Sequence, residues 1–308
     1  TTSIVVVNGD QMTTLRDDVP ELFGPGRRVI GVWFWELETL DGAAPVGDHL
    51  VDEIWSATEF MAGAFRGLGT VPVRVVPLPF RRPAPGGERR ASFAPFAGAD
   101  DRFVFGVVFD HLSVAARKNP VGAIEAFRRA FAPDEGPLLI VKTINGDRCW
   151  QAHEQLLAAT SDRADIVVWD EHLPGDEHDE FVASLDALVA LHRSEGLGLH
   201  LAAAMSIGVP VIATRYSGNL DFMDDSTAYL VDADLVPVGS DGAWAYPATA
   251  RWAEPRIEQA VEAMRDVVSG GRVELAGAAR SAIDRYATED EFIATVRDLI
   301  RSGSDRPR

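Results

Sequence analysis

The sequence predicts an α/β fold with two lobes, each built on a parallel β-sheet. Apolar runs of strand length alternate with helical segments along most of the chain, which is typical of parallel sheets with helices on both faces. A segment rich in Pro, Gly, Ala and Arg, residues 81–100, separates two such series and is predicted to be a linker. The length of 308 residues and the hydrophobic content of 46% suit two compact lobes.

The first series, before the linker, predicts four strands and two helices. Strands are expected at 4–7, 28–35, 51–55 and 71–80, and helices within 12–26 and over 57–66. Ser56 and Glu59, three positions apart, have the form of a capping box and predict the start of the second helix. The first strand would leave a sheet edge unpaired, so we expect a homodimer or a partner chain beside it.

The second series predicts a complete doubly wound domain. Its strands are expected at 103–109, 137–142, 165–169, 186–191, 209–213 and 227–231. Its helices are expected near 120–131, 148–160, 176–184, 197–207, 256–268, 273–286 and 288–301, the first of them with Pro120 in its first turn. Ligands bind such sheets at the carboxyl ends of the strands, so the loops that follow the strands are where a site is expected.

Composition excludes several classes of protein. The net charge of −18 disfavours generic binding to nucleic acid or to anionic lipid. No apolar run approaches the roughly 20 residues of a membrane span, and the first residues do not have the pattern of a signal peptide. Cys149 is the single cysteine, so neither an intrachain disulfide nor a CxxC metal site can form, which fits the cytoplasm.

Basic residues follow two of the predicted strands. Among 29 Lys and Arg residues the chain has two lysines, Lys118 and Lys142. A lysine that is retained in such an arginine-rich chain indicates a chemical role for its ammonium group. Arg117 and Lys118 stand directly before a helix start, where free backbone N–H groups and the helix dipole favour phosphate. The alternatives are a solvated basic pair and, for Lys142, a lysine that extends along the rim of the sheet.

Acidic and histidine residues follow the third strand. Asp170, Glu171 and His172 precede the turn signal Pro174-Gly175 and would line a base pocket; the alternative is a loop of solvated acids. The spacing of His172 and His178 fits no familiar metal-ligand pattern, so no metal site is predicted.

The loop after the fourth strand carries an isolated carboxylate, Glu195, in front of the helix 197–207. Gly196 and Gly198 allow the backbone to approach a ligand closely. A carboxylate facing a phosphate site is unfavourable unless it contacts another group, such as sugar hydroxyls.

These segments resemble the retaining glycosyltransferases of the GT-B fold, in particular family 4. The resemblance rests on "HRSEGLGLHLAAAMSIGVPVIATRYSGNLDFM", on "FDHLSVAARKNPVGAIEAFRRAF", and on "GVWFWELE" with the segment from "VDEIW" to "VVPLP". It implies two Rossmann-like lobes with the active site between them, a nucleotide-sugar donor in the C-terminal lobe and an acceptor in the N-terminal lobe. It also implies hexose transfer with retention from a GDP- or UDP-sugar to a glycan or lipid-linked glycan of the bacterial surface. The donor is a substrate; no metal and no cofactor is expected.

The resemblance assigns roles to residues of the C-terminal lobe. Lys118 matches the family's phosphate lysine, with Arg117 beside it, and these two with Glu195 are the catalytic candidates. Glu195 matches the first glutamate of the E-x7-E motif, which faces the transferred sugar. Sugar and phosphates would meet the loop residues Gly196, Leu197, Gly198 and Leu199, and Lys142, Glu171 and His172 complete the expected donor site.

The second glutamate of that motif, which bonds the ribose, is replaced by Ala203. Losing such a hydrogen bond to a charged group costs roughly 1.5–3 kcal/mol of donor binding, or one to two decades of affinity. The resemblance therefore leaves an alternative: a catalytically silent, GT-B-like nucleotide-binding or scaffold partner of an active transferase.

The resemblance also implies that about half of the N-terminal lobe is absent from this chain. The expected division is a partial acceptor lobe at 1–80, the linker at 81–100, the donor lobe at 101–275, and C-terminal helices at 276–308 that pack back on the N-terminal lobe. In the slot where the family carries a histidine, this sequence has Trp35 or Glu36. Asp10 and Glu36 are therefore the acceptor-side candidates. Such an enzyme would work in the cytoplasm, at the inner face of the membrane.

Overall fold

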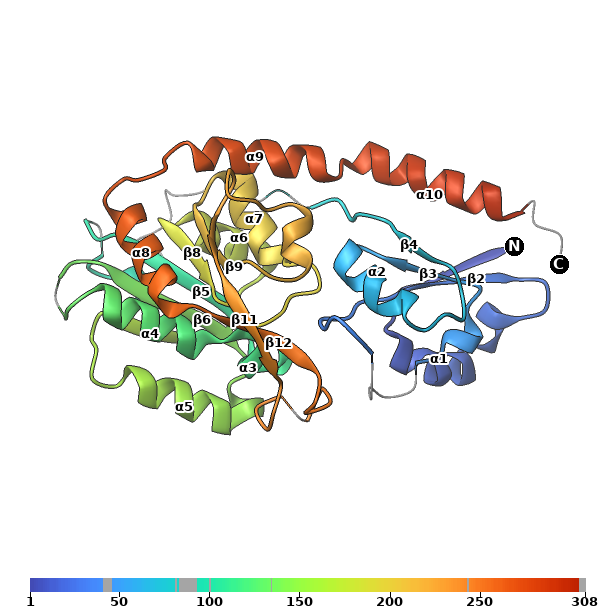
Figure 1. The fold of residues 1–308 in the computed structure, drawn as a ribbon, viewed down its shortest axis with the longest axis horizontal. Helices are drawn as coiled ribbons and strands as arrows, with labels where there is room; N and C mark the ends of the chain where they lie inside the picture. Colours follow the sequence, from blue (N-terminus) through green and yellow to red (C-terminus); the bar gives the residue numbers. More distant parts are fainter. Residues whose placement is uncertain are drawn as a thin grey trace.

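The computed structural model describes residues 1–40, 46–80, 82, 93–99, 101–133, 135–242 and 244–304. Two parallel sheets lie side by side along the chain, a four-stranded one near the N-terminus and a six-stranded one that follows (Figure 1). None of the described helices combines the length and the apolar composition that a membrane span requires.

The N-terminal sheet has the strand order β1-β2-β3-β4. Its strands are Thr2–Val5, Arg28–Val32, Glu53–Ser56 and Val73–Val75, and its helices are α1 (Met12–Asp18) and α2 (Glu59–Arg66). The strand predicted at 71–80 shrinks to β4, because Pro72, Pro77 and Pro79 flank it and proline cannot donate to a ladder. The predicted capping box is wrong: Thr58 caps α2, its hydroxyl accepting from the Met61 amide at 3.3 Å, whereas Ser56 belongs to β3.

The C-terminal sheet has the strand order β10-β9-β8-β5-β6-β7. Its strands are β5 (Val104–Asp110), β6 (Leu138–Ile144), β7 (Ile166–Asp170), β8 (Ala187–Ala190), β9 (Val211–Thr214) and β10 (Tyr229–Val231). All six lie within a few residues of their predicted positions. The chain builds outward from β5 to β7, then returns to the other side of β5 with β8. The sheet therefore has a topological switch point between β5 and β8, the place where ligands bind in such folds.

Helices cover both faces of this sheet. They are α3 (Ala115–Lys118), α4 (Pro120–Ala130), α5 (Trp150–Thr160), α6 (Gly175–Ala183), α7 (Leu199–Ile207) and α8 (Ile257–Val268). Two further helices follow: α9 (Leu275–Tyr286), which packs against α7, and α10 (Glu289–Ser304), which packs on the N-terminal sheet. Phe127 of α4 and Met264 of α8 are buried on one face, and Phe181 of α6 and Met205 of α7 on the other. The predicted helices are confirmed, and they give the apolar strands the two-sided cover that a buried parallel sheet requires.

A hairpin after β10 was not predicted. Its strands are β11 (Ala233–Pro237) and β12 (Arg251–Pro255), paired antiparallel. Most β11 residues are exposed or half-buried, so the apolar signal of a strand is weak there. Trp252 and Tyr246 anchor the hairpin in a small core that also contains Leu37 of the N-terminal half.

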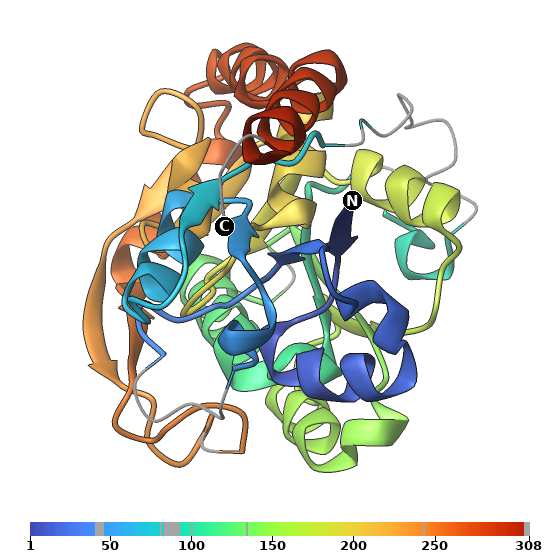
Figure 2. The same cartoon turned by 90° about the vertical axis from the view of Figure 1, so that its right-hand side faces the viewer.

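Helix α10 follows α9, which lies over the C-terminal half, and continues over the N-terminal sheet (Figure 1). Its apolar residues Phe292, Val296, Leu299 and Ile300 recur at helical spacing and pack against Ile30, Trp55 and Val76. Figure 2, seen from the N-terminal side, shows α9 and α10 above this sheet. The second half of the predicted linker also packs: Phe93 and Phe96 are buried against Phe181. Residues 81, 83–92 and 100 of that segment lie outside the described residues.

Candidate functional site

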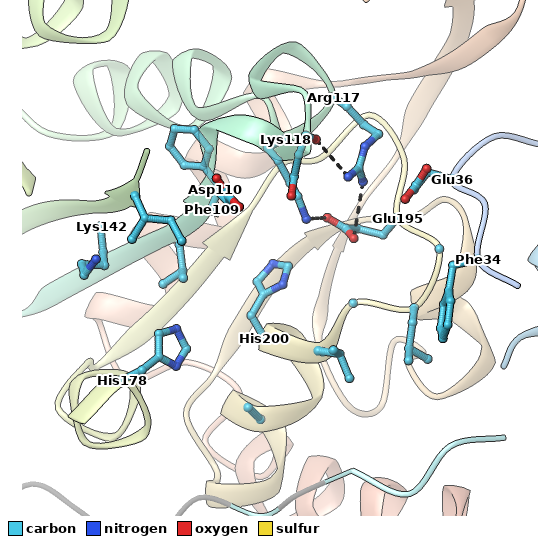
Figure 3. A pocket seen from close by; sticks show the side chains of 18 of the residues that line it. Phe34, Glu36, Phe109, Asp110, Arg117, Lys118, Lys142, His178, Glu195 and His200 are labelled. Carbon is cyan, nitrogen blue, oxygen red and sulfur yellow. Dashed lines mark hydrogen bonds and ion pairs between the residues drawn. The ribbon is translucent and has the colours of Figure 1, made fainter. Parts of the chain in front are cut away.

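A cavity of about 600 Å³ opens at the switch point between β5 and β8, where the two halves of the chain meet. The N-terminal half contributes Phe34, Glu36 and Phe80 to its lining. The C-terminal half contributes Val108, Phe109, Asp110, Ser113, Arg117, Lys118, Lys142, Ile144, His178, Asp179, the loop Glu195–Gly198, Leu199, His200 and Ala203. Figure 3 shows Arg117, Lys118 and Glu195 meeting in this space, with Lys142 apart from them.

Two glycines allow the tight conformation of the loop after β8: Gly198 within the loop, and Gly218, which follows β9 and packs against the loop. Gly198 precedes α7 with φ at 84°, in the left-handed region. Gly218 approaches so closely that a Cβ there would lie 1.8 Å from the carbonyl oxygen of Gly196. The Thr58 hydroxyl, from the N-terminal half, donates to the same carbonyl at 2.9 Å. The loop is therefore positioned by both halves of the chain.

Three ionised side chains meet at the centre of the cavity. The Lys118 ammonium donates to Oε1 of Glu195, and the Arg117 guanidinium lies 3.5 Å from Oε2 (Figure 3). Arg117 is 4% exposed and also donates to the Ser194 carbonyl at 2.8 Å and to the Ser113 carbonyl at 3.0 Å. The cluster neutralises the isolated carboxylate and leaves one surplus positive charge.

The backbone conformation around α3 positions the side chains of Arg117 and Lys118. Helix α3 is one turn long and lies between Val114 (φ 62°) and Asn119 (φ 53°), both left-handed. The Asn119 amide caps α4 and donates to the Leu191 carbonyl at 2.9 Å, at the end of β8. The strand ends of β5 and β8 are thereby fastened together, which sets Lys118 opposite Glu195.

The charges shift the pKa values of their neighbours. Burial alone would raise the pKa of Glu195, but Lys118 and Arg117 hold that pKa well below its usual value. Burial, together with the Lys118 ammonium, lowers the pKa of His200 to about 3. At neutral pH the cavity therefore contains an ionised Glu195 beside a neutral imidazole.

Lys142 is a third cation in the cavity lining. Its ammonium donates to the carbonyls of Thr143, at 2.8 Å, and Glu171, and it lies 5.2 Å from the ring centre of Trp169. Burial lowers its pKa to about 8. It is thus mostly charged at neutral pH but easily neutralised above it.

The structure brings most of the predicted donor-site residues together. Glu171 and His172 are exposed and are not among the lining residues, although the Glu171 carbonyl holds Lys142. Of the acceptor-side candidates, Glu36 lines the cavity and accepts from the Tyr246 hydroxyl at 3.1 Å. Asp10 is exposed in the turn before α1 and lies outside the lining.

Sequence reasoning missed several lining residues. His200 lies in the first turn of α7, within the segment that carries the resemblance, and its position in that turn could have indicated a lining residue. Asp110 is the last residue of β5, where a polar group at a strand end is a known sign of a site. Phe34 and Phe80 reach the cavity from the other half of the chain, which no local pattern reveals.

Residues 112–236 match the family described as "Glycosyl transferases group 1". This segment contains the Arg117–Lys118 pair and Glu195. No curated protein matches the chain.

Solved structures of several glycan-related proteins share the fold. The sucrose-phosphate synthase of Thermosynechococcus elongatus superposes with a TM-score of 0.71 at 12% identity, over 97% of this chain and 73% of its own. HepE of Anabaena, in complex with UDP and glucose, gives 0.70 at 12% identity, over 97% and 78%. A mutant of TarM from S. aureus, in complex with fondaparinux, alpha-GlcNAc-glycerol and UDP, gives 0.66 at 12% identity, over 96% and 55%.

The chain thus spans between about half and three quarters of the length of these proteins. Identities this low establish the fold alone. The expectation of a GT-B-like α/β fold with two Rossmann-like lobes is confirmed.

Proposed function

We propose that this chain is a glycosyltransferase that moves a hexose from a nucleoside-diphosphate sugar to a glycan acceptor. The observation that carries the proposal is the Arg117–Lys118–Glu195 cluster at the switch point, beside the N-terminus of α7. A diphosphate needs cations and free N–H groups, and a sugar needs a fixed acceptor for its hydroxyl protons. The cavity offers both, within the segment that matches the glycosyltransferase family.

When the donor binds, its diphosphate and Glu195 would both contact the Lys118 ammonium. The diphosphate would replace part of the carboxylate's contact with the ammonium, while Arg117, fixed by two carbonyls, keeps Glu195 ionised. The freed carboxylate oxygens would then accept hydrogen bonds from sugar hydroxyls. Lys142, the third cation in the cavity lining, would support the phosphates.

The transfer itself would proceed with retention and without a metal at the diphosphate. The bond between the anomeric carbon and the leaving phosphate oxygen breaks, and the bond to the acceptor oxygen forms on the same face of the sugar. The acceptor proton passes to the leaving phosphate, so no strong protein base is required. Arg117 and Lys118 stabilise the negative charge that grows on the diphosphate, which is where positioned cations accelerate such reactions most.

The acceptor would approach from the N-terminal half, past Glu36 and Phe34. We propose residues 1–80 as the acceptor lobe, 101–275 as the donor lobe, and a glycan or lipid-linked glycan made at the inner face of the membrane as the acceptor. A homodimer or a partner chain beside β1, the edge of the N-terminal sheet, is part of this proposal.

A second candidate function is a catalytically silent nucleotide-binding or scaffold partner. The observation that favours it is Ala203, which lines the cavity with a methyl group where the resemblance implies a ribose-binding carboxylate. In this role the chain would support an active transferase without turning over a donor.

Calorimetric titration with UDP, GDP and their hexose derivatives separates the two functions. The enzyme is expected to bind one nucleotide per chain and to hydrolyse its sugar donor slowly when no acceptor is present. NMR of the released or transferred sugar then shows whether the anomeric configuration is retained. Nucleotide binding with no hydrolysis and no transfer favours the silent partner, and no binding of any nucleotide contradicts the transferase.

A further inference from the structure

Two histidines and an aspartate meet at the carboxyl ends of β5 and β7, outside the interlobe cavity. His111 directly follows β5, His153 lies in the second turn of α5, and Asp170 is the last residue of β7. One side-chain nitrogen or oxygen from each lies within 4.8 Å of the other two. Among the described residues, His111 lines a second cavity, of about 990 Å³, and not the cavity that contains Glu195.

The spacing of the two imidazoles suits a shared metal ion. Nε2 of His111 lies 3.3 Å from Nδ1 of His153. In a tetrahedral zinc site with Zn–N bonds of about 2.0–2.1 Å, neighbouring ligand atoms are about 3.3–3.4 Å apart.

The buried ring of His111 has little else to bind. It is 1% exposed, and within the described part of the chain its Nδ1 has no hydrogen-bond partner. Among the described residues, the hydrogen-bond contact of its Nε2 is Nδ1 of His153, and an Asp170 oxygen lies within 4.8 Å of these atoms. Burying a polar ring with so few partners is costly, and a metal bond at Nε2 would offset that cost.

Gly146 leaves room beside the ligand atoms. Its backbone, with φ at −61° and ψ at −36°, would accept any residue. A Cβ there, however, would lie 2.5 Å from Oδ2 of Asp170 and 2.6 Å from Nδ1 of His153. The Gly146 amide donates to the same Oδ2 at 3.0 Å, which orients the carboxylate as outer contacts orient metal ligands.

We propose that His111, His153 and Asp170 bind one zinc ion. Two imidazoles and one carboxylate form a donor set that suits Zn²⁺, whereas Mg²⁺ and Ca²⁺ prefer oxygen ligands alone. Asp170 is exposed, so the fourth position faces solvent and takes water. The ion would join β5, α5 and β7 at the edge of the sheet that also carries the donor cavity. It is separate from the proposed transfer step.

The test uses the untagged full chain, treated with chelator and dialysed, and titrated calorimetrically with Zn²⁺ and with Mg²⁺. Wild type is expected to bind one Zn²⁺ per chain at micromolar Kd or tighter, to ignore Mg²⁺, and to gain a few degrees in Tm with excess zinc. Bound Co²⁺ should show the visible absorption of a tetrahedral site.

Two variants locate the ion. His153→Ala removes a ligand from a half-buried helix position, and Gly146→Ala inserts a methyl group between two ligands without straining the backbone. Each should weaken zinc binding about 10–100-fold, with far-ultraviolet circular dichroism unchanged, while the control His49→Ala binds zinc like wild type. The proposal is overturned if wild type binds no stoichiometric zinc, if Gly146→Ala binds it as tightly as wild type, or if the control loses binding equally.

Discussion

Lys118→Ala is the sharpest test of the proposed transfer site, because it removes one cation and keeps the rest of the cavity. The Lys118 side chain is 13% exposed and its partner Glu195 is 7% exposed, so both are largely shielded from water. After the substitution Glu195 retains Arg117 at 3.5 Å. The fold should therefore survive, with an Arg117–Lys118–Glu195 cluster that has lost its surplus positive charge.

The expected magnitudes differ for stability and for turnover. Breaking a buried ion pair by removing one partner costs about 3–5 kcal/mol when the remaining charge is left alone. Here Arg117 stays paired and the smaller side chain admits water, so we expect a loss of about 1–3 kcal/mol. Removing one group that stabilises growing negative charge lowers the turnover number by about 10²–10³-fold, and we expect a loss of this size.

The assay measures kcat and KM for donor hydrolysis or transfer beside the free energy of unfolding in urea. The double variant Lys118→Ala/Glu195→Gln also leaves the buried Arg117 without its carboxylate partner, so it should lose further stability and recover none of the lost turnover. Arg129→Ala, which removes an exposed ion-paired cation far along α4, is the control and should change both quantities little. A folded Lys118→Ala protein with turnover within about threefold of wild type would refute the electrostatic role assigned to Lys118.

Three further changes test other parts of the site. Ala203→Glu should tighten UDP or GDP binding about ten- to hundredfold in calorimetry, by a charged hydrogen bond of roughly 1.5–3 kcal/mol; unchanged affinity would mean that position 203 does not face a ribose. Gly218→Ala should lower Tm strongly and abolish nucleotide binding, because its Cβ would lie 1.8 Å from the Gly196 carbonyl oxygen. The control Gly63→Ala, in open space on α2, should raise the free energy of unfolding by about 0.5–1 kcal/mol. Equal effects of the two substitutions would contradict the reasoning. Lys142 has a folded pKa of about 8, below its usual 10.5, so between these values the unfolded chain binds a proton that the native state lacks. Urea unfolding should show wild type gaining stability relative to Lys142→Met as pH rises through this window; parallel profiles would contradict the lowered pKa.

Much of the C-terminal sheet and its helices could be predicted from the sequence, because their signals are local. A run such as Leu138–Val141 is apolar throughout and so indicates a strand buried on both faces. Pro120 marks the start of α4, and Gly198 marks a backbone turn in front of α7. The hairpin β11–β12 escaped prediction because none of the β11 residues is buried, so that this strand has little apolar pattern.

The sequence by itself determined which chemical groups stand at the ends of the strands: the Arg117–Lys118 pair and the lone Glu195. Only the tertiary structure decided which of these groups meet. Lys118 contacts Glu195 across 77 positions of sequence because β8 returns to pair with β5. His111, His153 and Asp170 converge for a similar reason, the approach of α5 and β7 to the end of β5. The periodicity of apolar and polar side chains indicates which face of its own helix or strand a residue occupies. The order of strands in a sheet depends instead on packing between distant segments, and that order brings the residues of both sites together.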